Sequence, residues 1–125
     1  MSRHDKAAAK TAIRNMLREY GLQAQKNADG VELQVRTHFG TATYAFPPDC
    51  ECALEAAERY VDDTDTDELA EGFFYSMWGI PADEIGTLDD KEARKAQKAL
   101  LDARAAAEDI VSALIDARSA LRQIA

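Results

Sequence analysis

The sequence has little of what marks secreted or membrane proteins. Its 125 residues include only two cysteines, Cys50 and Cys52, and a Cys-x-Cys pair is too close for an ordinary structural disulfide. No stretch approaches the roughly 20 apolar residues that span a bilayer. The polar N-terminal segment, residues 1–10, lacks the apolar stretch of a signal peptide. We therefore expect a cytoplasmic protein that does not bind membranes.

Large aliphatic side chains are also scarce. Leu, Ile, Val and Phe make up about a fifth of the chain, whereas alanine alone contributes 24 residues. This composition lies near the boundary for disorder. The large apolar residues nevertheless recur at helix and strand spacings, which favours folding. The sequence therefore predicts a single domain, residues 1–125, with a thin core lined by alanine.

Residues 1–46 have the pattern of one helix followed by strands. A helix is predicted over 5–20, where apolar residues form one stripe and Gly21 follows as a stop. Strands are predicted at 22–25, from Val31 onward, and at 41–46, because apolar residues alternate there or β-branched and aromatic residues gather. These segments predict an antiparallel β-meander of two or three strands.

Residues 47–86 change to helical periodicity. Asp49 is a suitable cap for a helix that ends near Val61. Asp65 is a suitable cap for a second helix that ends at Trp78, where Gly and Pro follow. We therefore expect an acidic region of two helices after the meander.

Residues 87–125 carry the strongest pattern, with Thr87 as the expected cap of a long last helix. From Leu88 to Ile124 there is no Pro and no Gly, and apolar residues alternate steps of three and four. We call this row of apolar residues the seam and expect it to be a self-association surface. Its main members are Leu100, Ala107, Ile110, Leu114 and Leu121. This spacing is typical both of packing inside the chain and of self-association. The predicted fold class is α+β, with an N-terminal helix, a meander and three further helices.

No motif for catalysis, metal binding or cofactor binding stands out. The chain has no Gly-rich phosphate loop and no nucleophile elbow. The spacing of His4, His38, Cys50 and Cys52 does not match a structural zinc site. The Asp-rich segment 62–68 lacks the Gly and the distal Glu of an EF-hand. We expect no catalytic residue, no metal and no cofactor; a small enzyme or metal protein built on Cys and His ranks last.

The charge distribution is more informative than any motif. The net charge is −8, and residues 47–90 hold 14 acids but one base, Arg59. An aromatic cluster lies in the same third of the chain. The predicted partner-binding surface consists of Asp62, Asp63, Asp65, Asp67, Glu68, Glu71, Phe74, Tyr75 and Trp78. Such a surface suits a basic protein and disfavours nucleic acid, whose phosphates it repels.

These features predict a small, acidic, non-enzymatic binding protein. The first hypothesis is an inhibitor or antagonist that docks on a basic, nucleic-acid-binding surface of a partner, as phage anti-defence and toxin-immunity proteins do. The alternative is a structural or adaptor protein that forms a homodimer through its C-terminal seam. Neither hypothesis involves direct contact with nucleic acid.

Overall fold

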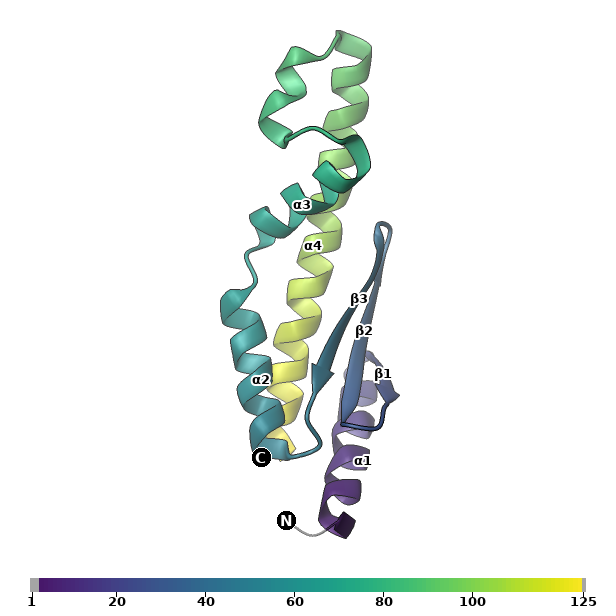
Figure 1. The fold of residues 1–125 in the computed structure, drawn as a ribbon, viewed down its shortest axis with the longest axis vertical. Coiled ribbons are helices and arrows are strands. Elements are labelled where there is room, and N and C mark those ends of the chain that lie inside the picture. Colours follow the sequence, from purple (N-terminus) through teal and green to yellow (C-terminus); the bar gives the residue numbers. More distant parts are fainter. Residues whose placement is uncertain (1–2, 125) are drawn as a thin grey trace.

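The computed structural model describes residues 3–124, with side chains from residue 6 onward, and has the predicted α+β architecture (Figure 1). Its elements are α1 (Arg3–Glu19), β1 (Gln23–Lys26), β2 (Val31–Thr37), β3 (Gly40–Phe46), α2 (Cys50–Asp63), α3 (Thr66–Trp78), the 3₁₀ helix η1 (Ala82–Thr87) and α4 (Asp90–Ile124). The N-terminal helix, the meander and the long C-terminal helix are confirmed.

The three strands form one antiparallel sheet in the order β1-β2-β3. In the middle strand, Leu33 pairs with Ala24 of β1 and with Tyr44 of β3. Val31 and Leu33 alternate with polar residues and are fully buried, because successive side chains of a strand point to opposite faces. One face of the sheet therefore belongs to the core and the other faces solvent.

Helix α4 is the spine of the molecule. Its 35 residues extend about 52 Å at 1.5 Å per residue. Helices α2 and α3 lie one after the other along it, with η1 beyond them, while α1 and the sheet flank its C-terminal part (Figure 1). Helix α4 is too long to be covered by a single neighbouring helix. Helices α2 and α3 and the 3₁₀ helix η1 therefore cover it one after another. Within the described residues, no helix, α4 included, is long and apolar enough to cross a membrane.

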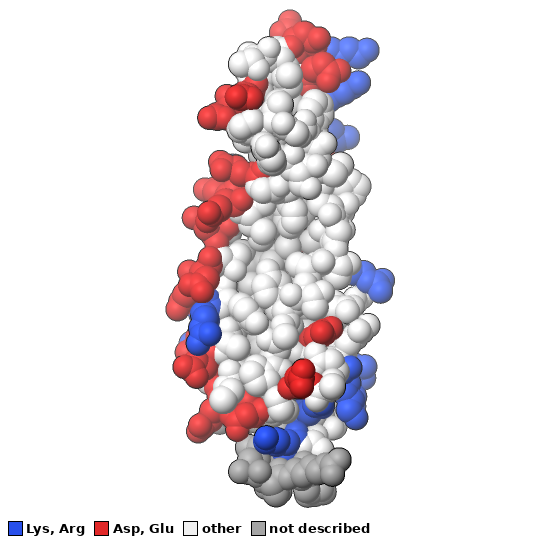
Figure 2. Space-filling model, viewed as in Figure 1, with Lys and Arg blue, Asp and Glu red and all other residues white. Residues whose placement is uncertain are grey.

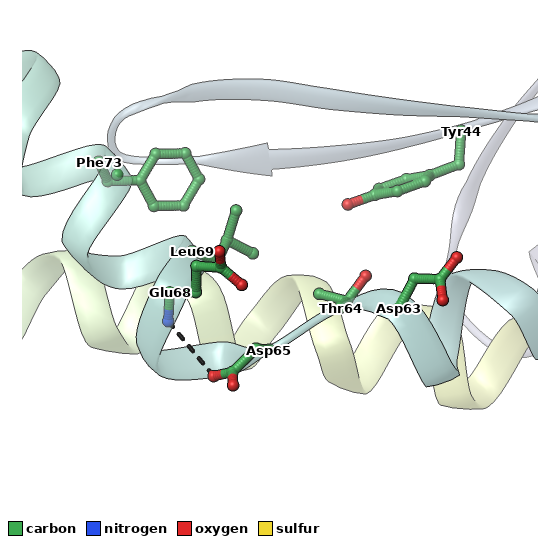
Figure 3. Close-up of a pocket in the computed structure, with 8 residues that line it drawn as sticks. Tyr44, Asp63, Thr64, Asp65, Glu68, Leu69 and Phe73 are labelled. Atoms are coloured by element: carbon green, nitrogen blue, oxygen red, sulfur yellow. Dashed lines mark hydrogen bonds between the residues drawn. The ribbon is translucent and has the colours of Figure 1, made fainter.

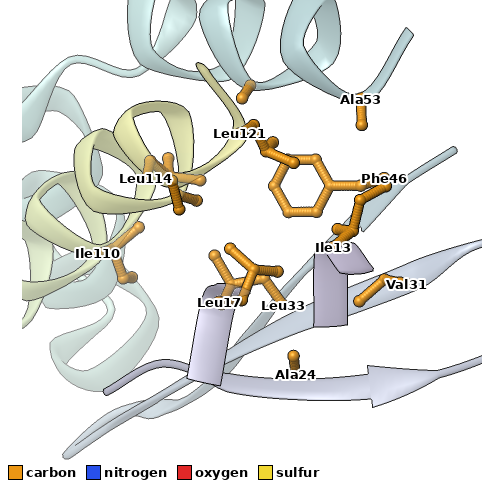
Figure 4. Packing of buried hydrophobic residues seen from close by; sticks show 13 residues of the cluster. Ile13, Leu17, Ala24, Val31, Leu33, Phe46, Ala53, Ile110, Leu114 and Leu121 are labelled. Carbon is orange, nitrogen blue, oxygen red and sulfur yellow. The ribbon is translucent and has the colours of Figure 1, made fainter. Parts of the chain in front are cut away.

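The main core lies between α1, the sheet, α2 and the C-terminal half of α4. Figure 4 shows Leu114 and Leu121 of α4 gathered with Phe46 of β3 and Leu17 of α1. These four side chains are at most 1% exposed. More than half of the buried apolar residues in the described chain are alanine, which confirms the expected thin, alanine-lined core.

A second, smaller cluster occupies the other end of α4. There Phe74 of α3 and Ile85 of η1 pack against Ala96 and Ala103. The small side chains of α4 allow α3 and η1 to approach closely. This cluster fixes the position of α3 on the spine.

The start of α4 differs from the prediction. Thr87 does not cap the helix, because it belongs to η1, where its hydroxyl donates to the Glu84 carbonyl. Leu88 follows in an extended conformation, which interrupts helical hydrogen bonding. The cap is Asp89, whose carboxylate accepts a hydrogen bond from the Glu92 N–H at 2.8 Å. The last helix therefore begins at Asp90 and not directly after Thr87.

The apolar seam of α4 is covered within a single chain. Ala107, Ile110, Leu114 and Leu121 are 0% exposed, and Leu100 is half-buried. The expectation that these residues form a self-association surface is wrong. Helices α2 and α3, which run antiparallel to α4, already pack against the seam together with α1 and the sheet. Packing between helices of one chain uses the same residue spacing as a coiled coil between two chains.

Candidate functional site: an acidic edge and two hollows

The acidic side chains expected to bind a partner lie exposed along one side of the molecule. Figure 2 shows carboxylates spaced along that side, over α2 and α3, with basic side chains among them. All six of the predicted acids are exposed: Asp62, Asp63, Asp65, Asp67, Glu68 and Glu71. The end of α2 and the first turns of α3 carry them, so a short connection brings them together.

The row of acids continues along α2 beyond the predicted residues. Glu51, Glu55, Glu58 and Asp62 follow at steps of four, three and four, which places them on one helix face. This helical spacing is visible in the sequence, and the prediction missed it by treating only the Asp-rich segment as a unit. We call the combined set the acidic edge: Glu51, Glu55, Glu58, Asp62, Asp63, Asp65, Asp67, Glu68 and Glu71.

Some of these carboxylates already have partners. Asp65 caps α3, because its side chain accepts hydrogen bonds from the N–H groups of Asp67 and Glu68 at 2.9 and 3.3 Å. Asp67 lies 3.8 Å from Arg104 and Glu58 lies 3.4 Å from Arg122. Both ion pairs are largely solvated and therefore weak.

The other acids have no such constraint. Among the described side chains, no ion pair involves Asp62, Asp63, Glu68 or Glu71. Each of these carboxylates is exposed and forms no ion pair within 4.0 Å among the described side chains. They are the members of the acidic edge best placed to meet cations of another molecule.

A shallow hollow lies between β3 and the junction of α2 with α3 (Figure 3). Its volume is about 390 Å³. Tyr44, Leu69 and Phe73 provide apolar lining, while carboxylates such as Asp63 and Glu68 stand at its rim. We call this depression the first hollow.

Aromatic contacts hold the walls of the first hollow in place. Phe73 of α3 stacks on Phe39 at the hairpin tip, with ring centroids 5.8 Å apart. Tyr44 meets Tyr60 of α2 edge to face at 5.1 Å. The Tyr60 hydroxyl donates to the Ala45 carbonyl of β3 at 2.9 Å. The helices and the hairpin are therefore joined at both sides of the hollow, which preforms it.

A second hollow of about 390 Å³ lies between α3 and the start of η1. Its lining consists of Glu71, Gly72, Tyr75, Pro81, Ala82 and Asp83. Gly72 also lines the first hollow, so the two hollows share this residue.

Gly72 has no structural requirement to be glycine. Its φ is not positive, and a Cβ atom added there would meet nothing within 4 Å. Inside a helix, glycine is less favourable than alanine by about 1 kcal/mol. Because it has no side chain, it adds no bulk to the part of α3 that lines both hollows.

The aromatic residues of α3 divide between surface and interior. Tyr75 is 57% exposed and Trp78 is half-buried. Phe74 is 0% exposed and stacks on Trp78 with centroids 6.0 Å apart. The assignment of Phe74 to the binding surface is therefore corrected, because it shares the face of Ala70, which α4 covers. Met77 of the same helix is 63% exposed.

Both cysteines are free thiols. Cys50 is half-buried and Cys52 is exposed. Burial raises the pKa of the Cys50 thiol, and the hydrogen bond with Asp49 raises the pKa of Cys52. Both thiols therefore stay protonated at neutral pH, which disfavours nucleophilic attack. Within the described part of the chain, His, Cys, Asp and Glu form no group of three suited to a metal; the His4 side chain lies outside it.

Replacing both Cys50 and Cys52 by serine is expected to leave the fold intact. Neither thiol is in a disulfide, and substitutions at such partly exposed positions change stability by about 0.5 kcal/mol or little more. Circular dichroism melting should show a shift of no more than a few degrees. Stoichiometric zinc in the purified protein, lost in the double variant, would contradict this expectation.

Comparison with family models, curated proteins and solved structures finds no match for this chain. The acidic edge and the two hollows are the features of the described surface that bear on function.

Proposed function

We propose that this protein is a non-enzymatic inhibitor or antagonist that docks its acidic edge on a basic surface of a partner protein. The observation that carries the proposal is the acidic edge itself: exposed carboxylates gathered on one side of the molecule (Figure 2). A field of one sign attracts an oppositely charged partner and accelerates association.

The shape of the surface supports a protein partner over a small molecule. Small-molecule sites enclose most of their ligand, whereas both hollows are open to solvent. Exposed Tyr75 lines the second hollow together with Glu71 and Asp83, and such aromatic residues are enriched at protein interfaces.

The sign of the charge supports antagonism of nucleic-acid binding. Proteins that bind nucleic acid present Lys and Arg to phosphates, and these same side chains are the natural partners of a carboxylate array. A protein that occupies them excludes the nucleic acid. The biological settings that fit this activity are phage anti-defence and toxin immunity, where small acidic antagonists serve this purpose.

Reversing charge on the acidic edge is expected to abolish partner binding. The variant replaces Asp62, Asp63, Glu68 and Glu71 by lysine. All four carboxylates are exposed and unpaired within the described chain, so the fold should persist while like charges now repel the partner. The measurement is affinity capture from an extract of the source organism, followed by titration of the captured protein and of its nucleic-acid binding.

A matched control separates local charge from net charge. It replaces four acids of α4, Asp102, Glu108, Asp109 and Asp116, by lysine and therefore changes the net charge equally. The wild type and this control should retain a basic, nucleic-acid-binding protein and block its binding to nucleic acid. Equal loss of binding in both variants would mean that only the net charge matters, and it would contradict the proposal. Capture of an acidic partner would also contradict it.

A further inference from the structure

We infer that the two hollows and Gly72 form one continuous cleft across α3, which receives a short basic segment of the partner protein. This inference rests on the proposed function and adds where the partner contacts the molecule and what kind of segment makes that contact. The observations that carry it are the shared lining residue of the hollows, the absence of a structural need for glycine there, and the carboxylates along the rim.

The apolar lining is arranged on both sides of Gly72. Leu69 and Phe73 lie in the first hollow, and Tyr75, Pro81 and Ala82 lie in the second. A Cβ or larger side chain at position 72 would stand between them, since both hollows include this residue. With glycine, the backbone of another molecule can pass close to α3 and place side chains in both hollows.

The rim specifies the charge of that segment. Asp63, Asp65 and Glu68 border the first hollow, and Glu71 and Asp83 border the second, while neither lining contains Lys or Arg. A segment that combines apolar side chains with Lys or Arg complements the hollows. Its apolar side chains fit the apolar lining, and its basic side chains fit the carboxylates at the rim. A second copy of this chain would bring another net charge of −8, so like-charge repulsion disfavours it as the occupant.

The test uses the full chain, labelled with ¹⁵N, and three synthetic six-residue peptides. One alternates Leu with Arg, one alternates Ser with Arg, and one alternates Leu with Glu. The Leu–Arg peptide should shift the amide resonances of Leu69, Gly72, Phe73, Tyr75 and Ala82. It should bind about tenfold more tightly than the Ser–Arg peptide, since its leucines bury apolar surface. The Leu–Glu peptide should not bind.

Gly72→Leu is the decisive variant because it blocks the cleft without changing charge. The position is open and leucine favours a helix over glycine, so the variant should melt no lower than the wild type and bind the Leu–Arg peptide about tenfold more weakly. Gly86→Leu is the matched control. Gly86 is also exposed with open space around it and lines neither hollow, so affinity should be unchanged.

The outcomes distinguish this inference from the proposed function. If charge reversal on the acidic edge abolishes partner binding but Gly72→Leu leaves both the partner and the peptide affinity unchanged, the cleft is wrong and the proposed function stands. If neither change affects the partner, both fail. Peptide-induced shifts that lie away from the hollows overturn the cleft on wild-type protein alone, and self-association blocked by Gly72→Leu would name a second copy as the occupant.

Discussion

Leu114→Asp is expected to unfold the protein. Leu114 is 0% exposed and lies in the main core among residues of α1, the sheet and α2 (Figure 4). Removing a buried leucine side chain costs about 2–5 kcal/mol, and an unpaired buried carboxylate adds several more. Typical total stabilities are only about 5–15 kcal/mol, and this core is lined with alanine and has few large side chains to compensate. Circular dichroism and thermal melting should show no cooperative native state at neutral pH.

Leu101→Asp is the matched control on the same helix. Leu101 is 64% exposed, so the same substitution there exchanges a solvated leucine for a solvated carboxylate and should leave the melting curve nearly unchanged. A Leu114→Asp variant that melts like Leu101→Asp would mean that the C-terminal half of α4 is not packed against the sheet.

Gly30→Ala is expected to destabilise the sheet strongly. A Cβ atom on Gly30 would lie 1.9 Å from the Phe46 carbonyl oxygen and 3.2 Å from the Pro47 carbonyl carbon. Both contacts are with backbone, so no side chain can rotate to relieve them. The end of β3 would have to separate from the β1–β2 turn, and overpacking of this kind costs about 1–3 kcal/mol or more. Chemical denaturation should show the loss as a lower midpoint at unchanged slope.

Gly86→Ala provides the comparison for Gly30→Ala. Gly86 has nothing within 4 Å of an added Cβ, and its φ is not positive. The substitution should therefore be neutral or slightly stabilising, because alanine restricts the unfolded chain. Equal midpoints for the two variants would show that Gly30 does not approach β3 as closely as described.

The sequence predicted the elements whose signals are local. The alternation around Val31 and Leu33 located the middle strand, and Asp49 and Asp65 located two helix starts, because each cap or alternation acts over a few residues. Thr87 misled the prediction, since Thr and Asp89 are both good caps and only the extended backbone of Leu88 decides between them.

Features that depend on distant neighbours could not be predicted. In α3, apolar residues occupy more than one face, so the sequence does not say that Phe74 is buried while Met77 is exposed; contact with α4 decides it. The packing partner of the α4 seam could not be predicted either, because the same residue spacing suits a helix of the same chain and a helix of a second copy. The first hollow was invisible for a similar reason: Tyr44 and Leu69 meet only through the packing of β3 beside the helices.

The second cluster has a consequence for how the molecule opens. Its buried residues are Phe74, Ile85 and two alanines, surrounded by partly buried side chains such as Trp78 and Leu100, so it contributes less apolar burial than the main core at the other end of α4. Local opening near α3 and η1 should therefore require less free energy than global unfolding. The second hollow borders this end of the molecule through Pro81, Ala82 and Asp83, so we expect a segment bound there to suppress this local opening while the sheet end of the spine stays closed.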